Sequence, residues 1–287
     1  MSTKDNLSYP QEFKVRKLRQ RSAASAKTSI IPPNDGMIDR MNFAHYIMRY
    51  INHGNFSAPV EDKLEDGIRV IDVGCGSGIW TMEMARDFPA STFIGMDIAE
   101  TFPKTNLTNC SFIRADALKR LPFADETFDY VFMRFMYLSF TPEDWVTVVG
   151  ELVRLTKPGG WVELFDSDLS IEQPPPSYVR FMDALTTCTL SRGIDLKVTR
   201  KLGELLRAAS LKDVESDYVS QPVGWHGRAG VQMGEILVMI RKAMRTVIAP
   251  VMAMTDDEYD QWAVTVGKEM REHRSWTKAF YAYGVKP

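Results

Sequence analysis

Short runs of apolar, often β-branched residues alternate through the middle of the chain with longer segments in which apolar residues recur every three or four positions. The helical spacing predicts one helix over 79–88, which Pro89 ends, and another over 142–156. The short runs predict strands over 68–73, 92–97, 110–115, 129–133 and 161–166. Strands that alternate with helices in this way are typical of a doubly wound, mostly parallel α/β sheet.

A helix is also predicted ahead of the first strand. Apolar residues recur at helical spacing over 34–50, and either Asn34 or Asp35 can cap its start. The helix can pack on the sheet as part of the core. It can also close over a ligand at the carboxyl edge of the sheet, with Arg40, His45 or Tyr46.

Beyond Phe165 the alternation continues. Helices are predicted near 177–191 and over 198–209, and strands over 213–220 and 276–285. The stretch 226–273 between the last two strands is mostly helical by pattern, so it is a long insertion. It can roof a substrate cavity with the adaptable apolar side chains of Met233, Ile236, Leu237 and Met239.

The first residues of the chain have no apolar periodicity. Residues 1–34 are therefore predicted to be a disordered or loosely attached arm, and residues 35–287 to form a single domain. The arm contains a basic cluster of Lys14, Arg16, Lys17, Arg19 and Arg21. This cluster fits a solvated tail, a nuclear-import signal or a patch for an acidic partner.

Composition narrows the classes of partner. The chain has 35 basic and 37 acidic residues among its 287, so it has no overall attraction to nucleic acid. Its cysteines, Cys75, Cys110 and Cys188, are too few and too scattered for a disulfide framework or a zinc site. The longest apolar runs, such as 236–240, are far shorter than a membrane span. We therefore expect a soluble cytoplasmic or nuclear protein that binds neither nucleic acid nor membrane.

The most informative stretch is 70–80, where an apolar run ends in Asp72 and is followed by Gly74, Gly76 and Gly78. It predicts a strand, a tight loop and a helix. The dinucleotide-binding fingerprint has its third glycine three residues after the second, whereas here the interval is two. Asp72 would also repel a pyrophosphate and attract a cation. S-adenosylmethionine carries an ammonium and a sulfonium but no phosphate, so it is the predicted cofactor.

This acid-x-Gly-x-Gly-x-Gly motif resembles the first motif of the class I methyltransferases. The resemblance implies that Asp97, after the second strand, accepts hydrogen bonds from both ribose hydroxyls, and that Asp116 accepts one from the adenine amino group. Asp97 can instead cap a helix, Asp116 can cap a turn, and Arg134 can pair with a neighbouring acid rather than the cofactor carboxylate. The predicted cofactor residues are Asp72, Gly74, Cys75, Gly76, Gly78, Asp97, Ile98, Asp116, Ala117, Met133 and Arg134.

Over residues 34–287 the chain is most similar to the fungal LaeA-like methyltransferases. The similarity rests on Asp39-Arg40 with His45, on Gly78-Ile79-Trp80, on Lys157-Pro158-Gly159-Gly160-Trp161 with Glu163, on Gly224-Trp225 before Gly234-Glu235, and on Lys286-Pro287. It implies a seven-stranded sheet in which the last strand is antiparallel and lies between the fifth and the sixth. Val285 and Ser210-Leu211 depart from the family pattern, which leaves the subfamily open.

The resemblance implies transfer of a methyl group to an oxygen or nitrogen of a small molecule, such as a secondary metabolite. If the reaction needs a base, the candidates are Asp166, Asp168 and His226, and more remotely His45. Tyr137, Phe165 and Trp225 are expected to shape the acceptor pocket, and no metal site is expected. Two alternatives remain, a LaeA-like regulator that binds the cofactor but acts through protein partners, and a protein methyltransferase.

Overall fold

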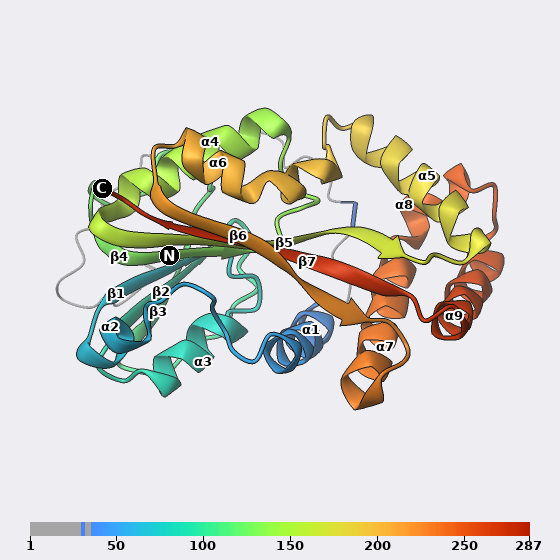
Figure 1. Cartoon of the computed structure of the whole chain (residues 1–287), viewed down its shortest axis with the longest axis horizontal. Coiled ribbons are helices and arrows are strands. Elements are labelled where there is room, and N and C mark those ends of the chain that lie inside the picture. Colours follow the sequence, from blue (N-terminus) through green and yellow to red (C-terminus); the bar gives the residue numbers. More distant parts are fainter. Residues whose placement is uncertain (1–29, 32–35) are drawn as a thin grey trace, which may run out of the picture.

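The computed structural model describes residues 30–31 and 36–287, and its centre is a single seven-stranded sheet in the order β3-β2-β1-β4-β5-β7-β6 (Figure 1). Neighbouring strands from β3 to β5 are parallel, and β7 is antiparallel to both β5 and β6. The strands are β1 (Arg69–Val73), β2 (Thr92–Asp97), β3 (Cys110–Arg114), β4 (Phe128–Arg134), β5 (Thr156–Glu172), β6 (Lys212–Pro222) and β7 (Trp276–Val285). The predicted fold class is confirmed, including the place of the last strand.

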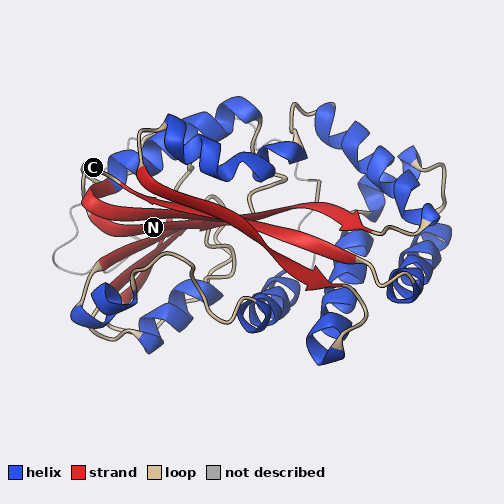
Figure 2. Cartoon of the chain, viewed as in Figure 1, coloured by secondary structure: helices blue, strands red, loops and turns tan. Residues whose placement is uncertain are grey.

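Helices cover both faces of the sheet (Figure 2). One face carries α1 (Met37–Ile51), α2 (Glu61–Asp66) and α3 (Ile79–Asp87), and the other carries α4 (Pro142–Leu155) and α6 (Leu202–Ala208), which a short 3-10 turn over Leu196–Lys201 precedes (Figure 1). The beginning of α4 follows from its sequence, because Thr141 and Asp144 form a capping box and Pro142 takes the first helical position.

The predicted insertion is helical, as expected. It consists of α7 (Gly227–Ala243), α8 (Arg245–Val251) and α9 (Asp256–Glu272), which gather with α5 (Pro176–Leu190) beyond the carboxyl ends of β5 and β6 (Figure 1). Its two ends are neighbours in space because Pro222 of β6 pairs with Trp276 of β7.

Three local features differ from the sequence prediction or escape it. The helix α2 was not predicted, and β5 runs to Glu172 instead of ending near residue 166, because it keeps pairing with β7 across a bulge between Ser167 and Ile171. Asn34 and Asp35, the expected caps of α1, lie outside the described residues. The N-cap position is Gly36, which makes no side-chain hydrogen bond there.

The core has two parts, one on each face of the sheet. Side chains of α1, α3 and the insertion form one buried cluster, and side chains of α4 and α6 form the other. Alternation along the strands decides the face, so Phe132 belongs to the α1 and α3 side while Met133 belongs to the α4 side. The candidate site therefore lies on the face that α1 and α3 cover.

Candidate functional site

The glycine loop forms a tight turn between β1 and α3. Gly74, Gly76 and Gly78 have φ angles of +77°, +54° and +72°, a region that glycine adopts without strain. The backbone N–H groups of Gly74 and Cys75 donate to the carbonyl of Met96, and that of Gly76 donates to Oδ2 of Asp97 at 2.9 Å. The loop is thus fastened to the end of β2, which brings Asp97 beside it as the sequence predicted.

The three glycines face different neighbours. A Cβ atom at Gly78 would lie 2.6 Å from the Phe112 ring, and one at Gly74 would lie 2.7 Å from Sδ of Met136. At Gly76 the nearest atom would be Sδ of Met41, at 3.2 Å. Met41 belongs to α1, so this helix lies over the middle of the loop, as the prediction of a covering helix requires.

Asp72 is a buried carboxylate near the end of β1, and only one of its two oxygens accepts a hydrogen bond from the described residues. Its Oδ2 accepts from the Thr81 hydroxyl at 2.6 Å, while its Oδ1 has no hydrogen-bond partner among the described residues. Burial raises the pKa of Asp72 to about 6, and the positive charge of Arg134 acts against that rise. A buried acceptor without a partner costs free energy, so this oxygen is set up for a donor that the polypeptide does not supply.

Arg134 connects this carboxylate to α1. Its Nη2 lies 3.1 Å from Nδ1 of His45, and Nε2 of the same ring lies 2.6 Å from Oε2 of Glu83 on α3. Burial lowers the pKa of His45 to about 4, so the ring is neutral at pH 7. A neutral ring that donates to Glu83 from Nε2 accepts from Arg134 at Nδ1. His45 therefore bridges α1, α3 and β4.

Of the three residues proposed to close the site, His45 and Arg40 are buried and Tyr46 is exposed. Glu83 was not singled out from the sequence, although it also holds Arg49 and Asn55. Its spacing of three residues from Trp80 places it on the same side of α3, which is the only signal in the sequence for its role.

The other predicted cofactor residues lie along the edge of the sheet. Asp97 accepts at Oδ1 from the backbone of Ala99, and Asp116 accepts from the backbone of Leu118 and pairs with Lys119 at 3.0 Å. Ile98 is exposed, Cys75 and Ala117 are buried, and Met133 lies on the opposite face from Arg134. Asp97 is thus hydrogen-bonded to the glycine loop, while Asp116 contacts the backbone of Leu118 and the side chain of Lys119 within its own turn.

This difference predicts the outcome of two alanine substitutions. Asp97→Ala is expected to weaken cofactor binding roughly 100-fold, because hydrogen bonds to a charged acceptor are worth about 1.5–3 kcal/mol each and the loop also loses its tie. Asp116→Ala is expected to cost about tenfold or less. Isothermal titration calorimetry with S-adenosylhomocysteine measures both, with thermal melting as the folding control. A larger loss at Asp116 would mean that the two roles are reversed.

On the acceptor side, both carboxylate oxygens of Asp166 accept hydrogen bonds from backbone N–H groups. Its Oδ2 accepts from the N–H of Met136 at 2.8 Å, its Oδ1 from that of Ser167 at 2.9 Å, and Tyr137 contributes a further backbone hydrogen bond. Burial nevertheless raises the pKa of Asp166 to about 8. Asp166 therefore shapes the turn that positions Tyr137, whose own hydroxyl is close enough to Arg40 for their charges to interact. Phe165 is buried against Phe135 in an edge-to-face pair.

Asp168, His226 and Trp225 lie in other surroundings. Asp168 is buried and forms an ion pair with Arg200 at 2.5 Å. Trp225 donates from Nε1 to the carbonyl of Ser275, and together with the exposed His226 it lines a surface cleft of about 600 Å³. A second, much smaller cavity is lined by Arg134 and Phe165, and the two cavities share no residue. The structure therefore groups Asp166, Tyr137 and Phe165 and separates Trp225 and His226 from them.

The described part of the chain contains neither a candidate metal cluster nor a helix that could span a membrane. Within residues 30–31 and 36–287 there is no group of three or more His, Cys, Asp or Glu side chains placed to hold a metal ion. None of the helices in these ranges is long and apolar enough to cross a membrane.

Comparison with known proteins agrees with the geometry. Residues 70–160 match the family model of a methyltransferase domain. N-methyltransferase verN of Clonostachys rogersoniana is 32% identical over 167 residues, which cover 55% of this chain and 58% of that protein. The secondary metabolism regulator LAE1 of Cochliobolus heterostrophus is 25% identical over 193 residues, which cover 64% and 62%. The chain thus spans about three fifths of the length of these curated relatives.

A solved structure shares the fold. The crystal structure of a proposed methyltransferase from an antibiotic biosynthesis pathway of Anabaena variabilis superimposes with a TM-score of 0.54 at 14% identity, covering 84% of this chain and 97% of the other. The sheet order, the glycine loop and the match over residues 70–160 show a methyltransferase domain, and the chain resembles the class I S-adenosylmethionine-dependent methyltransferases. Its relatives include fungal proteins, the secondary metabolism regulator LAE1 among them, as the sequence motifs predicted.

Proposed function

We propose that this protein binds S-adenosylmethionine and transfers its methyl group to an oxygen or nitrogen atom of a small molecule, a secondary metabolite. The observation that carries the proposal is that Asp72 and Arg134 lie close together beside the glycine loop. Asp72 offers a buried oxygen without a partner, and Arg134 offers a guanidinium close enough for the two charges to interact. An acid and a base side by side fit the ammonium and the carboxylate at the amino-acid end of the cofactor.

The remaining residues fit the other parts of the same ligand. Asp97 lies at the end of β2, where it can accept from ribose hydroxyls in addition to the backbone of Gly76. Among the described residues, a Cβ at Gly76 would meet only the flexible end of Met41, so the loop allows a ligand to approach closely. The cofactor supplies a methyl group on a positively charged sulfur, which transfers without metal assistance.

The chain itself has to align the acceptor and exclude water. Tyr137, just after β4, and Phe165, within β5 beside the end of β4, are both buried, and α1 covers the loop from the other side. Alignment in a dry pocket can account for a large part of the rate, so a dedicated base is optional. If one acts, Asp166 is the candidate, because it lies beside Tyr137. Its pKa of about 8 leaves a fraction of the carboxyl ionised at neutral pH.

A nitrogen acceptor is supported by the relative verN, which is named an N-methyltransferase and is 32% identical to this chain over 167 residues. The similarity to the regulator LAE1 supports a second candidate, a cofactor-binding protein that acts through protein partners. The two candidates differ in what they need. A metabolite methyltransferase turns over with purified protein alone, whereas a regulator requires its partner and, if it acts on transcription, a nuclear pool that a fluorescent fusion would reveal. A cytoplasmic pool is proposed for the first candidate.

The experiment combines binding and turnover. The purified full chain should bind S-adenosylmethionine with low-micromolar affinity, and it should leave NADH unbound in the same calorimeter. With the methyl-labelled cofactor, it should transfer label to a small molecule in fungal metabolite extracts without added protein. Folded protein that gives no heat or thermal shift at millimolar cofactor would refute the proposal. Binding without any labelled small molecule, but with label on a co-purified protein, would favour the alternatives.

A further inference from the structure

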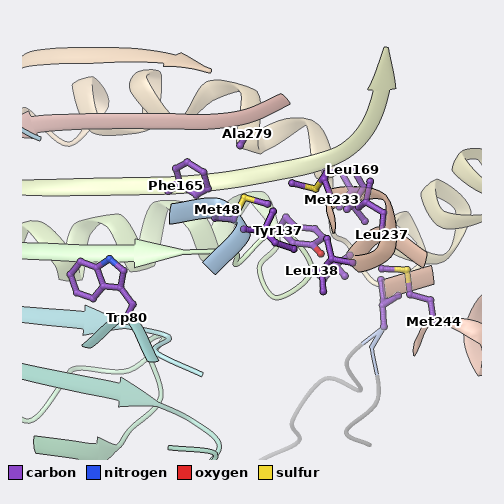
Figure 3. Close-up of a cluster of buried hydrophobic side chains, with 14 of the residues drawn as sticks. Met48, Trp80, Tyr137, Leu138, Phe165, Leu169, Met233, Leu237, Met244 and Ala279 are labelled. Atoms are coloured by element: carbon purple, nitrogen blue, oxygen red, sulfur yellow. The ribbon is translucent and has the colours of Figure 1, made fainter. Parts of the chain in front are cut away.

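Arg241 is a buried arginine of the insertion, with 2% of its surface exposed. It lies on α7 one helical turn after Leu237. Figure 3 shows Leu237 and Met233 gathered with Tyr137, Leu138 and Leu169 at the ends of β4 and β5. Residues four apart share a helix face, so Arg241 continues the side of α7 that faces the acceptor end of the site. Arginine is almost never fully buried without a partner.

No acid of the described chain pairs with this guanidinium. Nε and Nη2 have no hydrogen-bond partner within residues 30–31 and 36–287, and Nη1 reaches only Sδ of Met270, at 3.7 Å. Two phenols are close, but the Tyr178 hydroxyl donates to the carbonyl of Leu169 and the Tyr259 hydroxyl to that of Arg241 itself. Burial raises the pKa of both phenols, so neither carries a compensating negative charge. A buried cation without a counter-charge is strongly unfavourable.

The two unpartnered nitrogens lie on one edge of the planar group. In a guanidinium, Nε–H and one N–H of Nη2 point the same way, and this edge matches the two oxygens of a carboxylate. Gly267 of α9 lies against Nη2, and a Cβ there would be 3.6 Å away. Because Gly267 has no side chain, this position of α9 offers Nη2 no side-chain partner. The surrounding cluster includes Met233, Met244 and Met270, whose flexible side chains can rearrange around a ligand.

A row of polar groups leads from the cofactor side to this edge. Tyr137 interacts electrostatically with Arg40 on α1 and with Tyr178, and Tyr178 interacts in the same way with Arg241. This row crosses an otherwise apolar cluster, and convergent polar groups in apolar walls are the usual composition of a small-molecule site.

We infer that Arg241 binds a carboxylate group of the methyl acceptor, so that the acceptor is an organic acid whose reactive atom lies toward Tyr137. This inference rests on the proposed function, because it assigns the acceptor end of the same site. The cofactor carboxylate has a different cation, since Arg134 lies beside Asp72 at the glycine loop. The Arg241 edge is therefore left for the second substrate.

The first test concerns stability and needs no substrate. Arg241→Met is expected to raise the melting temperature by at least about 2 °C, because a methionine of similar length removes an unpaired buried charge. Arg245→Met is the matched control. Arg245 is four residues further on and pairs with Asp260 at 2.7 Å, so its loss should leave the melting temperature unchanged or lower. A clear fall on Arg241→Met would show that the guanidinium holds the fold together, and would overturn the inference.

The second test uses phenylacetate and phenylacetamide, which differ only in the charged group. With S-adenosylhomocysteine present, millimolar phenylacetate should raise the melting temperature of the wild type and of Arg245→Met, and phenylacetamide should not. Arg241→Met should lose at least tenfold in affinity for the acid while its cofactor affinity is unchanged. Arg241→Lys keeps the charge but not the planar edge, so it should lose part of the affinity for phenylacetate.

Equal shifts by acid and amide, an acid preference that survives in Arg241→Met, or a shift with acetate as large as that with phenylacetate would each overturn the inference. These outcomes do not depend on turnover. If the protein binds the cofactor but shows no preference for the acid, the inference fails and the proposed function stands. If it prefers the acid but does not bind the cofactor, the proposed function fails.

Discussion

Replacing Asp72 by Asn is expected to weaken binding of S-adenosylmethionine by at least about 100-fold while the protein stays folded. The substitution keeps the shape of the side chain and an acceptor for Thr81, but it removes the charge that faces the cofactor ammonium. Breaking a buried charge pair costs about 3–5 kcal/mol, and each 1.4 kcal/mol is a factor of about ten in Kd. Calorimetry on the purified variant measures the loss directly.

In the absence of cofactor, the same substitution should stabilise the fold and not weaken it. The folded pKa of Asp72 is about 6, above its unfolded value of about 3.9. For a group whose pKa is raised by folding, the stabilising contribution is present below the unfolded pKa and is lost as the pH rises through the folded pKa. At pH 7 the ionised Asp72 therefore destabilises the cofactor-free fold by up to about 3 kcal/mol. Asp72→Asn relieves that cost, so its melting temperature should match or exceed that of the wild type.

The same pKa predicts a pH dependence of binding. Below about pH 6 the wild-type carboxyl takes up a proton and cofactor affinity should fall, whereas the affinity of Asp72→Asn should be flat over that range. Thr81→Val serves as the control, because it removes the bond at Oδ2 and leaves Oδ1 in place. An Asp72→Asn variant that binds as tightly as the wild type at pH 7 would place the ammonium elsewhere.

Trp80→Ala is expected to cause the largest loss of stability of any single substitution considered for this chain, about 3–5 kcal/mol. Trp80 is fully buried, and its ring stacks on Phe132 with centroids 4.1 Å apart. Its Nε1 also donates to the carbonyl of Asn55 at 2.8 Å, which fixes the segment between α1 and α2. Urea unfolding measures the loss, which is a large part of the about 5–15 kcal/mol that stabilises a typical domain.

Trp80→Phe separates the two contributions. It keeps an aromatic ring against Phe132 and loses the hydrogen bond to Asn55, so it should cost about 1–2 kcal/mol. If Trp80→Ala costs less than Trp80→Phe, or if neither changes the unfolding midpoint, the ring does not anchor the sheet face as its contacts indicate.

The parts of the fold that follow local rules were predictable from the sequence. β1, α3 and β2 begin and end within a residue of the prediction, because Asp72, the glycines and Pro89 mark their boundaries. The length of β5 was not predictable. Asp166 and Asp168 interrupt its apolar pattern, and only pairing with β7, more than a hundred residues away, keeps the strand extended.

The site shows the same division. Motif spacing places Asp97 beside the glycine loop, since both lie at adjacent strand ends. The bridge from Arg134 through His45 to Glu83 joins residues 38 and 89 positions apart, and no periodicity in one sequence reports such a contact. Trp225 shows the limit of reasoning by elimination. The sequence predicts Trp225 in the acceptor pocket, yet its indole donates a hydrogen bond to the carbonyl of Ser275 beside a separate cleft.

The pairing of Pro222 with Trp276 has a consequence for how proteins of this kind diversify. Both ends of the helical insertion leave the sheet at one hydrogen-bonded pair, so the segment between them closes on itself. Changing the length of such a closed segment costs little free energy, because closure entropy grows only with the logarithm of length. The insertion can therefore vary in length without a large change in the stability of the sheet. If the proposed function holds, a different segment between the same two strands would change the wall at the acceptor end and leave β1, β2 and the glycine loop unaltered.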